Sequence, residues 1–158
     1  MKVVVQRAKD ASVSVEGREV GSIKGGLVLL VGFTKGDSFA EINYMVDKVV
    51  NLRIFDDEKG VMNKSLVDVG GSVLSISQFT LYADTKKGRR PSYINALGGE
   101  EAIKLYELFN KTLRENLSKF STEAVVEEGI FGADMQVRFT NDGPVTIILE
   151  KEGDASGE

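Results

Sequence analysis

Apolar residues in this chain follow two spacings, one typical of strands and the other typical of helices. Valine-rich stretches at residues 2–6 and 12–15 predict strands, and residues 16–19 predict the turn of an antiparallel hairpin. Residues 27–33 form an apolar run flanked by glycine, which is typical of a strand covered on both faces. We therefore expect the chain to begin with antiparallel strands and to place residues 27–33 centrally in a sheet.

Two later segments repeat their apolar residues at helical spacing. Ser38 and Glu41 form a capping box ahead of an apolar stripe through residues 42–50. A longer stripe runs through residues 100–117, with acidic residues in the first turn, where they complement the helix dipole. Each predicted helix therefore has one apolar face to pack on the sheet.

The remaining apolar segments are short and predict strands. They are residues 52–55, 72–79, 124–126, 135–139 and 145–149, with breaks expected at residues 129–132 and 141–144. Many strands and two main helices predict one α+β domain with a curled, mostly antiparallel or mixed sheet that is barrel-like. Residues 151–158 are polar, and we expect a mobile C-terminal tail there.

The composition restricts the available chemistry, because the 158 residues include no histidine and no cysteine. A Ser-His or Cys-His nucleophile pair, a disulfide and an ordinary zinc site are therefore excluded. Hydroxyls, carboxylates, lysines, backbone amides or the substrate itself remain, and we expect no metal and no other cofactor. No apolar stretch reaches membrane-spanning length or resembles a signal peptide, so we expect a cytoplasmic protein without membrane contact.

Residues 77–81 place hydroxyl and amide side chains around an aromatic ring at the end of a predicted strand. Thr80 could attack or orient an acyl carbon, while Gln78 or nearby backbone N–H groups hold the developing oxyanion. Serine and threonine are also common at strand edges, so the structural interpretation of this segment stays open beside the catalytic one.

A basic loop follows, in a chain whose formal net charge is -4. Its four cations are Lys86, Lys87, Arg89 and Arg90. The loop and the following Tyr93 suit phosphate contact and stacking on a single-stranded nucleic-acid end, although a solvated loop explains them equally well. Phe131, near Gly129 and Gly132, could stack on a base or pack in the core.

Three segments in this order resemble the D-aminoacyl-tRNA deacylase family: residues 77–81, 83–92 and 141–146. Residues 5–8, 11–13 and 132–135 are also similar to that family, so the resemblance extends over residues 1–150. It implies a homodimer that hydrolyses the ester bond between a D-amino acid and tRNA. Residues 141–146 predict only a turn on their own, but the resemblance implies that they take part in the active site.

The resemblance also implies roles for individual residues. Thr80 acts at the scissile ester together with Gln78, Ser77 and Phe79, while the basic loop and Phe131 bind tRNA. Gly143 and Pro144, joined by a cis peptide bond, enter the partner's active site, where their carbonyl groups exclude an L side chain. Arg7 helps to hold this element. Glycine is achiral and passes such a filter, so mischarged glycine is a second expected substrate.

Alternatives remain for both the mechanism and the function. Thr80 either forms an acyl-enzyme or leaves catalysis to water assisted by the 2′-hydroxyl of the terminal adenosine, and the absence of histidine favours assisted water. A non-catalytic module that binds tRNA ends predicts salt-sensitive binding without turnover. A small-molecule esterase predicts cleavage of simple esters without RNA.

Overall fold

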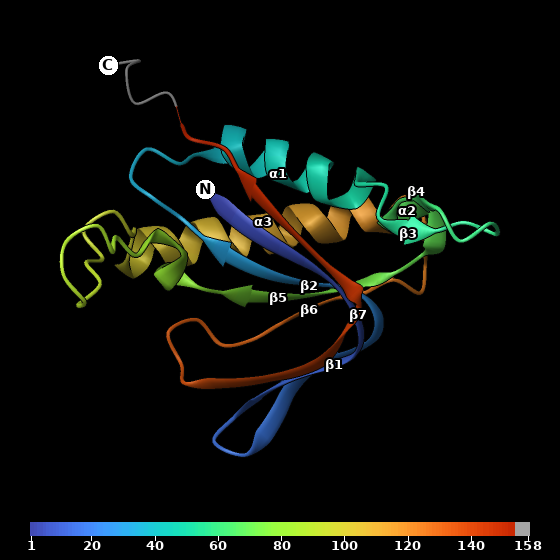
Figure 1. Cartoon of the computed structure of the whole chain (residues 1–158), viewed down its shortest axis with the longest axis horizontal. Coiled ribbons are helices and arrows are strands. Elements are labelled where there is room, and N and C mark those ends of the chain that lie inside the picture. Colours follow the sequence, from blue (N-terminus) through green and yellow to red (C-terminus); the bar gives the residue numbers. More distant parts are fainter. Residues whose placement is uncertain (154–158) are drawn as a thin grey trace.

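The computed structural model describes residues 1–153, in which a curled five-stranded sheet carries two long helices on one face (Figure 1). The strand order is β6-β5-β2-β1-β7. The sheet strands are β1 (Lys2–Val15), β2 (Arg18–Gly32), β5 (Ser72–Ser77), β6 (Val126–Glu128) and β7 (Met135–Glu150). The remaining elements are β3 (Phe55–Asp56), β4 (Met62–Lys64), the helices α1 (Phe39–Asn51), α2 (Leu66–Val69) and α3 (Gly99–Ser118), and the 3-10 helix η1 (Phe79–Tyr82).

The sheet mixes both strand orientations. β1 pairs antiparallel with β2 and β7, whereas β5 pairs parallel with β2 and β6. This confirms the expected α+β domain with a curled mixed sheet and two main helices. The strand order ends at β6 on one side and at β7 on the other, so these two strands form the edges of the sheet.

The first two strands form the predicted hairpin, with Glu16 and Gly17 at its turn. Both residues have positive φ angles, 51° and 77°, as a tight two-residue hairpin turn requires. The prediction of two separate strands at residues 2–6 and 12–15 was wrong. One strand runs through both segments, with a positive φ angle of 51° at Asp10 and shifts in the register with β7 between them.

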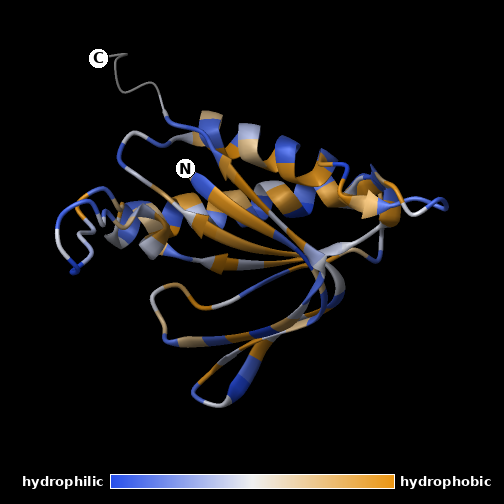
Figure 2. Ribbon diagram, in the orientation of Figure 1, coloured by the Kyte–Doolittle hydropathy of each residue, from blue (hydrophilic) through white to orange (hydrophobic). Residues whose placement is uncertain are grey.

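The predicted central strand lies in the second half of β2 and is covered on both faces. Leu27 and Leu29 are buried beneath the helices, while Val28 packs into a second core cluster inside the curl of the sheet. Figure 2 shows the apolar residues on these strands and on the helix faces that cover them. The residues of this apolar run therefore contribute to two cores, one on each face of the strand.

Both long helices form where the sequence predicts them. The Ser38 hydroxyl accepts a hydrogen bond from the N–H of Ala40 at the start of α1, and it also donates to the Glu41 carboxylate at 3.2 Å. In α3, Ala102, Tyr106 and Phe109 are buried at the expected spacing. The apolar faces of both helices thus join the larger core.

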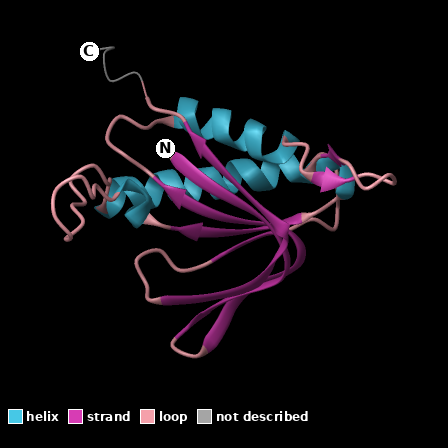
Figure 3. Cartoon of the chain, viewed as in Figure 1, coloured by secondary structure: helices cyan, strands magenta, loops and turns pink. Residues whose placement is uncertain are grey.

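Other predicted strands have different bounds (Figure 3). Residues 52–55 contribute only the start of the two-residue strand β3, and residues 72–79 give a strand that ends at Ser77. β7 continues through residues 141–144, where a break was predicted, because β1 pairs with it on both sides of that segment. The sequence analysis did not predict β4, α2 or η1.

The last described residues lie beside the start of the chain. The N–H of Lys151 donates to the carbonyl of Met1, and the ammonium group of Met1 donates to the carbonyl of Lys151 and to Asp37. Residues 154–158 of the predicted tail lie outside the described residues. Within residues 1–153, no helix is both long enough and apolar enough to span a membrane.

Candidate active site

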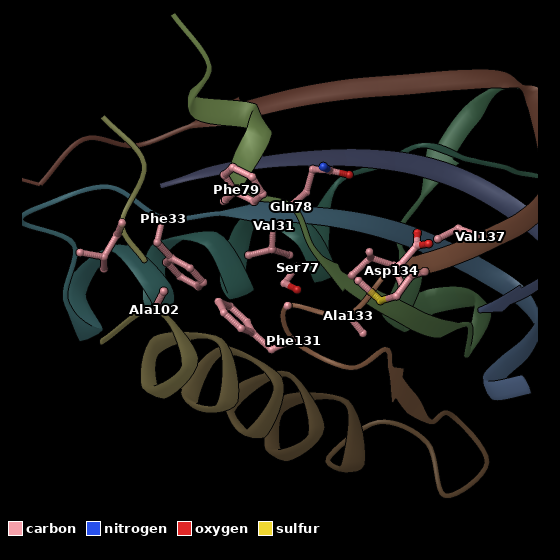
Figure 4. A pocket seen from close by; sticks show the side chains of 15 residues that line it. Val31, Phe33, Ser77, Gln78, Phe79, Ala102, Phe131, Ala133, Asp134 and Val137 are labelled. Carbon is pink, nitrogen blue, oxygen red and sulfur yellow. The ribbon is translucent and has the colours of Figure 1, made fainter. Parts of the chain in front are cut away.

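A cavity of about 240 Å³ opens where β2 and β5 end (Figure 4). β2 and the residue after it contribute residues 31–33, and the end of β5 with the following turn contributes residues 76–79. Leu97, Ala102, residues 131–135 and Val137 complete the wall. Most of this lining is apolar, with the side chains of Ser77, Gln78 and Asp134 as its polar groups.

The predicted hydroxyl motif lies at the edge of this cavity. The N–H of Gln78 donates to the carbonyl of Val31 at 2.7 Å, which extends the β2–β5 pairing by one residue before η1 begins. The side-chain amide of Gln78 then donates to the hydroxyl of Thr80. Ser77, Gln78 and Phe79 line the cavity, while Thr80 is exposed one residue beyond the lining.

Gly32 lets the turn that carries this motif approach β2. A Cβ atom at residue 32 would lie 2.9 Å from the carbonyl oxygen of Gln78 and 3.1 Å from the Cβ of Leu81. Any side chain there would therefore displace the motif. The sequence analysis did not assign Gly32 to the site, although a glycine inside the apolar run at residues 27–33 was a usable signal.

Phe131 forms part of the cavity wall and is half-buried. Its ring packs against Tyr106 on α3, with the ring centroids 5.9 Å apart. The Tyr106 hydroxyl donates to the carbonyl of Ser75 at 2.6 Å, and burial raises the pKa of Tyr106. Tyr106 therefore stays protonated at neutral pH, so it supports the wall and does not supply a base.

All four cations of the basic loop are exposed, and none forms an ion pair within residues 1–153. The loop closes at its base, where Asp84 and Ser92 exchange two backbone hydrogen bonds of 2.7 and 2.9 Å. Tyr93 follows immediately, and its ring meets Phe79 edge to face with the centroids 5.0 Å apart. The loop is thus attached to the wall of the cavity.

Gly143 and Pro144 lie on an irregular part of β7 and are exposed. Gln6 pairs with Thr146 and Ala8 pairs with Asn141, so residues 142–145 bulge outward opposite Arg7. The peptide bond between Gly143 and Pro144 is cis, as the family resemblance implies. Neither residue lines the cavity of its own chain, so one chain does not bring them together with residues 77–80.

Arg7 is buried beneath this bulge and contacts it directly. Its Nε donates to the carbonyl of Asp142 at 3.1 Å and lies 3.4 Å from the carboxylate of the same residue. Its Nη1 donates to the carbonyl of Ile54 at 2.9 Å and lies 3.4 Å from the carboxylate of Asp56. The sequence did not predict Ile54 and Asp56 as partners of Arg7, because these contacts join segments far apart in the chain.

Comparisons with known proteins agree over nearly the whole chain. The family model for D-Tyr-tRNA(Tyr) deacylase matches residues 4–150. A Clostridium tetani protein named D-aminoacyl-tRNA deacylase is 57% identical over 152 residues, which cover 96% of this chain and 98% of that protein. A Bacillus velezensis protein of the same name is 53% identical over 152 residues, covering 96% and 99% of the two chains.

Two solved structures resemble this fold. One, described as c-Myc DNA Unwinding Element Binding Protein, has a TM-score of 0.88 and 41% identity, and the match covers 97% of this chain and 100% of that one. The other, described as a probable eukaryotic D-amino acid tRNA deacylase, has a TM-score of 0.78 at 17% identity over 94% and 97% of the two chains. At that identity, the second likeness concerns the fold alone.

Proposed function

Since this chain belongs to the D-Tyr-tRNA(Tyr) deacylase family and is a D-aminoacyl-tRNA deacylase, we propose that residues 1–150 form a deacylase domain whose cavity holds the aminoacyl end of tRNA. The observation that carries this proposal is the position of Gln78 and Thr80. They lie at the mouth of an apolar cavity, next to an exposed basic loop. The cavity accommodates an amino-acid side chain, and the loop supplies charges for the RNA phosphates.

The reaction is the addition of water to the carbonyl carbon of the aminoacyl ester. The bond between this carbon and the ribose oxygen then breaks, which releases the D-amino acid and tRNA. The 2′-hydroxyl of the terminal adenosine relays the proton from water to the departing oxygen. The Thr80 hydroxyl, together with the backbone N–H groups of residues 79 and 80, stabilises the negative charge that develops on the carbonyl oxygen.

The surroundings of Thr80 favour attack by water assisted by the tRNA 2′-hydroxyl over a mechanism in which Thr80 forms an acyl-enzyme. Within residues 1–153, the Thr80 hydroxyl is hydrogen-bonded to the amide of Gln78 and to no carboxylate or amine. An amide donor cannot remove the hydroxyl proton, whereas it leaves the hydroxyl free to donate to the substrate. Thr80 therefore acts as a hydrogen-bond donor in this mechanism.

Substituting Thr80→Ala is expected to lower kcat by about a hundred-fold and by no more than about a thousand-fold, because it removes one donor to the oxyanion and no nucleophile. Single-turnover hydrolysis of D-tyrosyl-tRNA measures this effect, with Thr80→Ser as the control that retains the hydroxyl. A loss beyond about a thousand-fold, or a trapped acyl-enzyme, would instead assign Thr80 as the nucleophile.

Chiral selection is proposed to require a second copy of the chain. The bulge with Gly143 and Pro144 is exposed and lies on β7, an edge strand whose Ile148 is 70% exposed. An apolar edge of this kind favours pairing with another chain. In the dimer, the bulge enters the partner's cavity, where its carbonyl groups reject L side chains and admit D side chains or glycine.

The deciding experiment compares hydrolysis of D-tyrosyl-tRNA, L-tyrosyl-tRNA and glycyl-tRNA, together with the molecular mass in solution by sedimentation. Cleavage of the D and glycyl esters alone by a dimer is expected. Equal cleavage of the D and L esters would contradict the filter, and an active, selective monomer would contradict the role of the partner. Binding of tRNA without any turnover would leave the tRNA-end-binding module as the function.

The basic loop is expected to act on binding and not on the chemical step. Replacing Lys86, Lys87, Arg89 and Arg90 with glutamine should raise KM for D-tyrosyl-tRNA about ten-fold at low salt and leave kcat unchanged. The variant should also lose salt dependence, since fewer counterions are released on binding. Steady-state kinetics between about 50 and 200 mM salt check this. An unchanged salt dependence would contradict it.

A further inference from the structure

An aromatic contact joins the segment after the basic loop to the Gln78–Thr80 turn. Phe79, at the start of η1, is 53% exposed. The edge-to-face partner of its ring is Tyr93, at a centroid distance of 5.0 Å and an interplanar angle of 65°. Such pairs have a preferred geometry, so Tyr93 restricts the orientations open to Phe79.

Tyr93 is itself fixed by backbone contacts on both sides. The Asp84–Ser92 bridge closes the loop immediately before it, and the N–H of Ala96 donates to the Tyr93 carbonyl at 3.0 Å. One residue later, the N–H of Leu97 donates to the carbonyl of Phe33 at 2.9 Å, and both of these residues line the cavity. The segment that carries Tyr93 is therefore anchored to the cavity wall.

We propose that Tyr93 is a positioning residue, whose ring holds Phe79 and so fixes the turn that presents Gln78 and Thr80 to the ester. This rests on the proposed function and adds to it a residue that makes no contact with the reacting atoms. Phe79 lines the cavity and adjoins both polar residues in sequence, so rotation of its ring would alter the wall and the turn together. The contact with Phe79 is one between the two rings.

Stacking of Tyr93 directly on an RNA base is the competing role for this exposed ring, and the two roles predict different kinetics. A positioning residue affects the chemical step with any substrate that occupies the cavity. A residue that contacts RNA affects the binding of tRNA and has no effect on an ester that lacks the nucleotides beyond the terminal one.

The test uses the full chain with two substrates, D-tyrosyl-tRNA and the D-tyrosyl ester of adenosine. Tyr93→Ala is expected to lower kcat about ten-fold on both and to leave KM within about two-fold. Tyr93→Phe is expected to restore kcat, and adding Tyr93→Ala to a Phe79→Ala variant should cost nothing further. Ile94→Ala, at a neighbouring position that is 84% exposed, is the matched control and should resemble the unaltered chain.

Several results would overturn this proposal. These are a loss confined to D-tyrosyl-tRNA and visible only in KM, a Tyr93→Phe variant as impaired as Tyr93→Ala, or additive losses in the double variant. Thermal melting checks each fold, and Tyr93→Leu replaces Tyr93→Ala if alanine lowers the melting temperature. If the unaltered chain cleaves neither ester, the proposed function fails too; if it cleaves both and Tyr93→Ala does so equally well, only the positioning role fails.

Discussion

Gly32→Ala is expected to lower kcat/KM for D-tyrosyl-tRNA by roughly ten- to a hundred-fold, because the new methyl group displaces the turn that carries Gln78. The nearest atom to it, at 2.9 Å, is a backbone oxygen, which cannot rotate away as a flexible side chain can. The same turn is tied to β2 by the Gln78–Val31 hydrogen bond, so the displacement strains the end of the sheet as well. A stability loss of about 1–3 kcal/mol should accompany the loss of activity.

Gly25→Ala is the matched control on the same strand, because the nearest atom to its Cβ would be the carbonyl oxygen of Ala8 at 3.9 Å. That distance is an ordinary van der Waals contact, so both activity and stability should remain near those of the unaltered chain. Kinetics and urea unfolding of the two variants provide the comparison. Equal activity of the Gly32→Ala and Gly25→Ala variants would show that the turn tolerates displacement.

Arg7→Ala is expected to lower the free energy of unfolding by about 2–3 kcal/mol, since it removes hydrogen bonds to two carbonyl groups and ion pairs with two carboxylates. The carboxylates of Asp56 and Asp142 are partly exposed, which keeps the cost below that of a fully buried pair. The bulge with Gly143 and Pro144 loses its support at the same time. Discrimination between D and L esters should therefore fall as well.

Lys9→Ala isolates the part of this effect that comes from surface charge. Lys9 is also paired with Asp142, at 3.8 Å, but its side chain is exposed, so its loss should cost less than about 0.5 kcal/mol. Urea denaturation measures both stabilities, and paired D- and L-tyrosyl-tRNA assays measure the discrimination. A cost for Arg7→Ala no larger than that for Lys9→Ala would refute the supporting role of Arg7.

Local patterns in the sequence predict those elements whose burial and capping are also local. The central strand at residues 27–33, the helix after Ser38 and the long helix through Phe109 follow directly from spacing and caps. The middle of β7 does not, because glycine and proline favour a break there. Pairing with β1 on both sides of the bulge overrides this preference, and only tertiary structure reveals that pairing.

The segments of the candidate site can be predicted from the sequence, whereas the contacts between them cannot. The order of motifs predicts residues 77–80, the basic loop and Gly143–Pro144 as site residues, because each is a contiguous segment. The contacts that hold these segments join distant parts of the chain, such as Arg7 to Ile54 and Phe79 to Tyr93. A glycine at residue 32 marks a close approach, but the sequence does not say which backbone approaches it.

The pairing of the first strand with the last affects the order in which the sheet can form during synthesis. The hairpin of β1 and β2, and its parallel partner β5, are all available well before β7 has been synthesised. Until then, the outer edge of β1 lacks its partner, and an unpaired edge in a nascent chain is a site for aggregation or for chaperone binding. The Gly143–Pro144 bulge forms only when β7 adds to that edge. A chain stalled before residue 135 therefore has the cavity walls that come from β2 and β5, but it lacks the bulge.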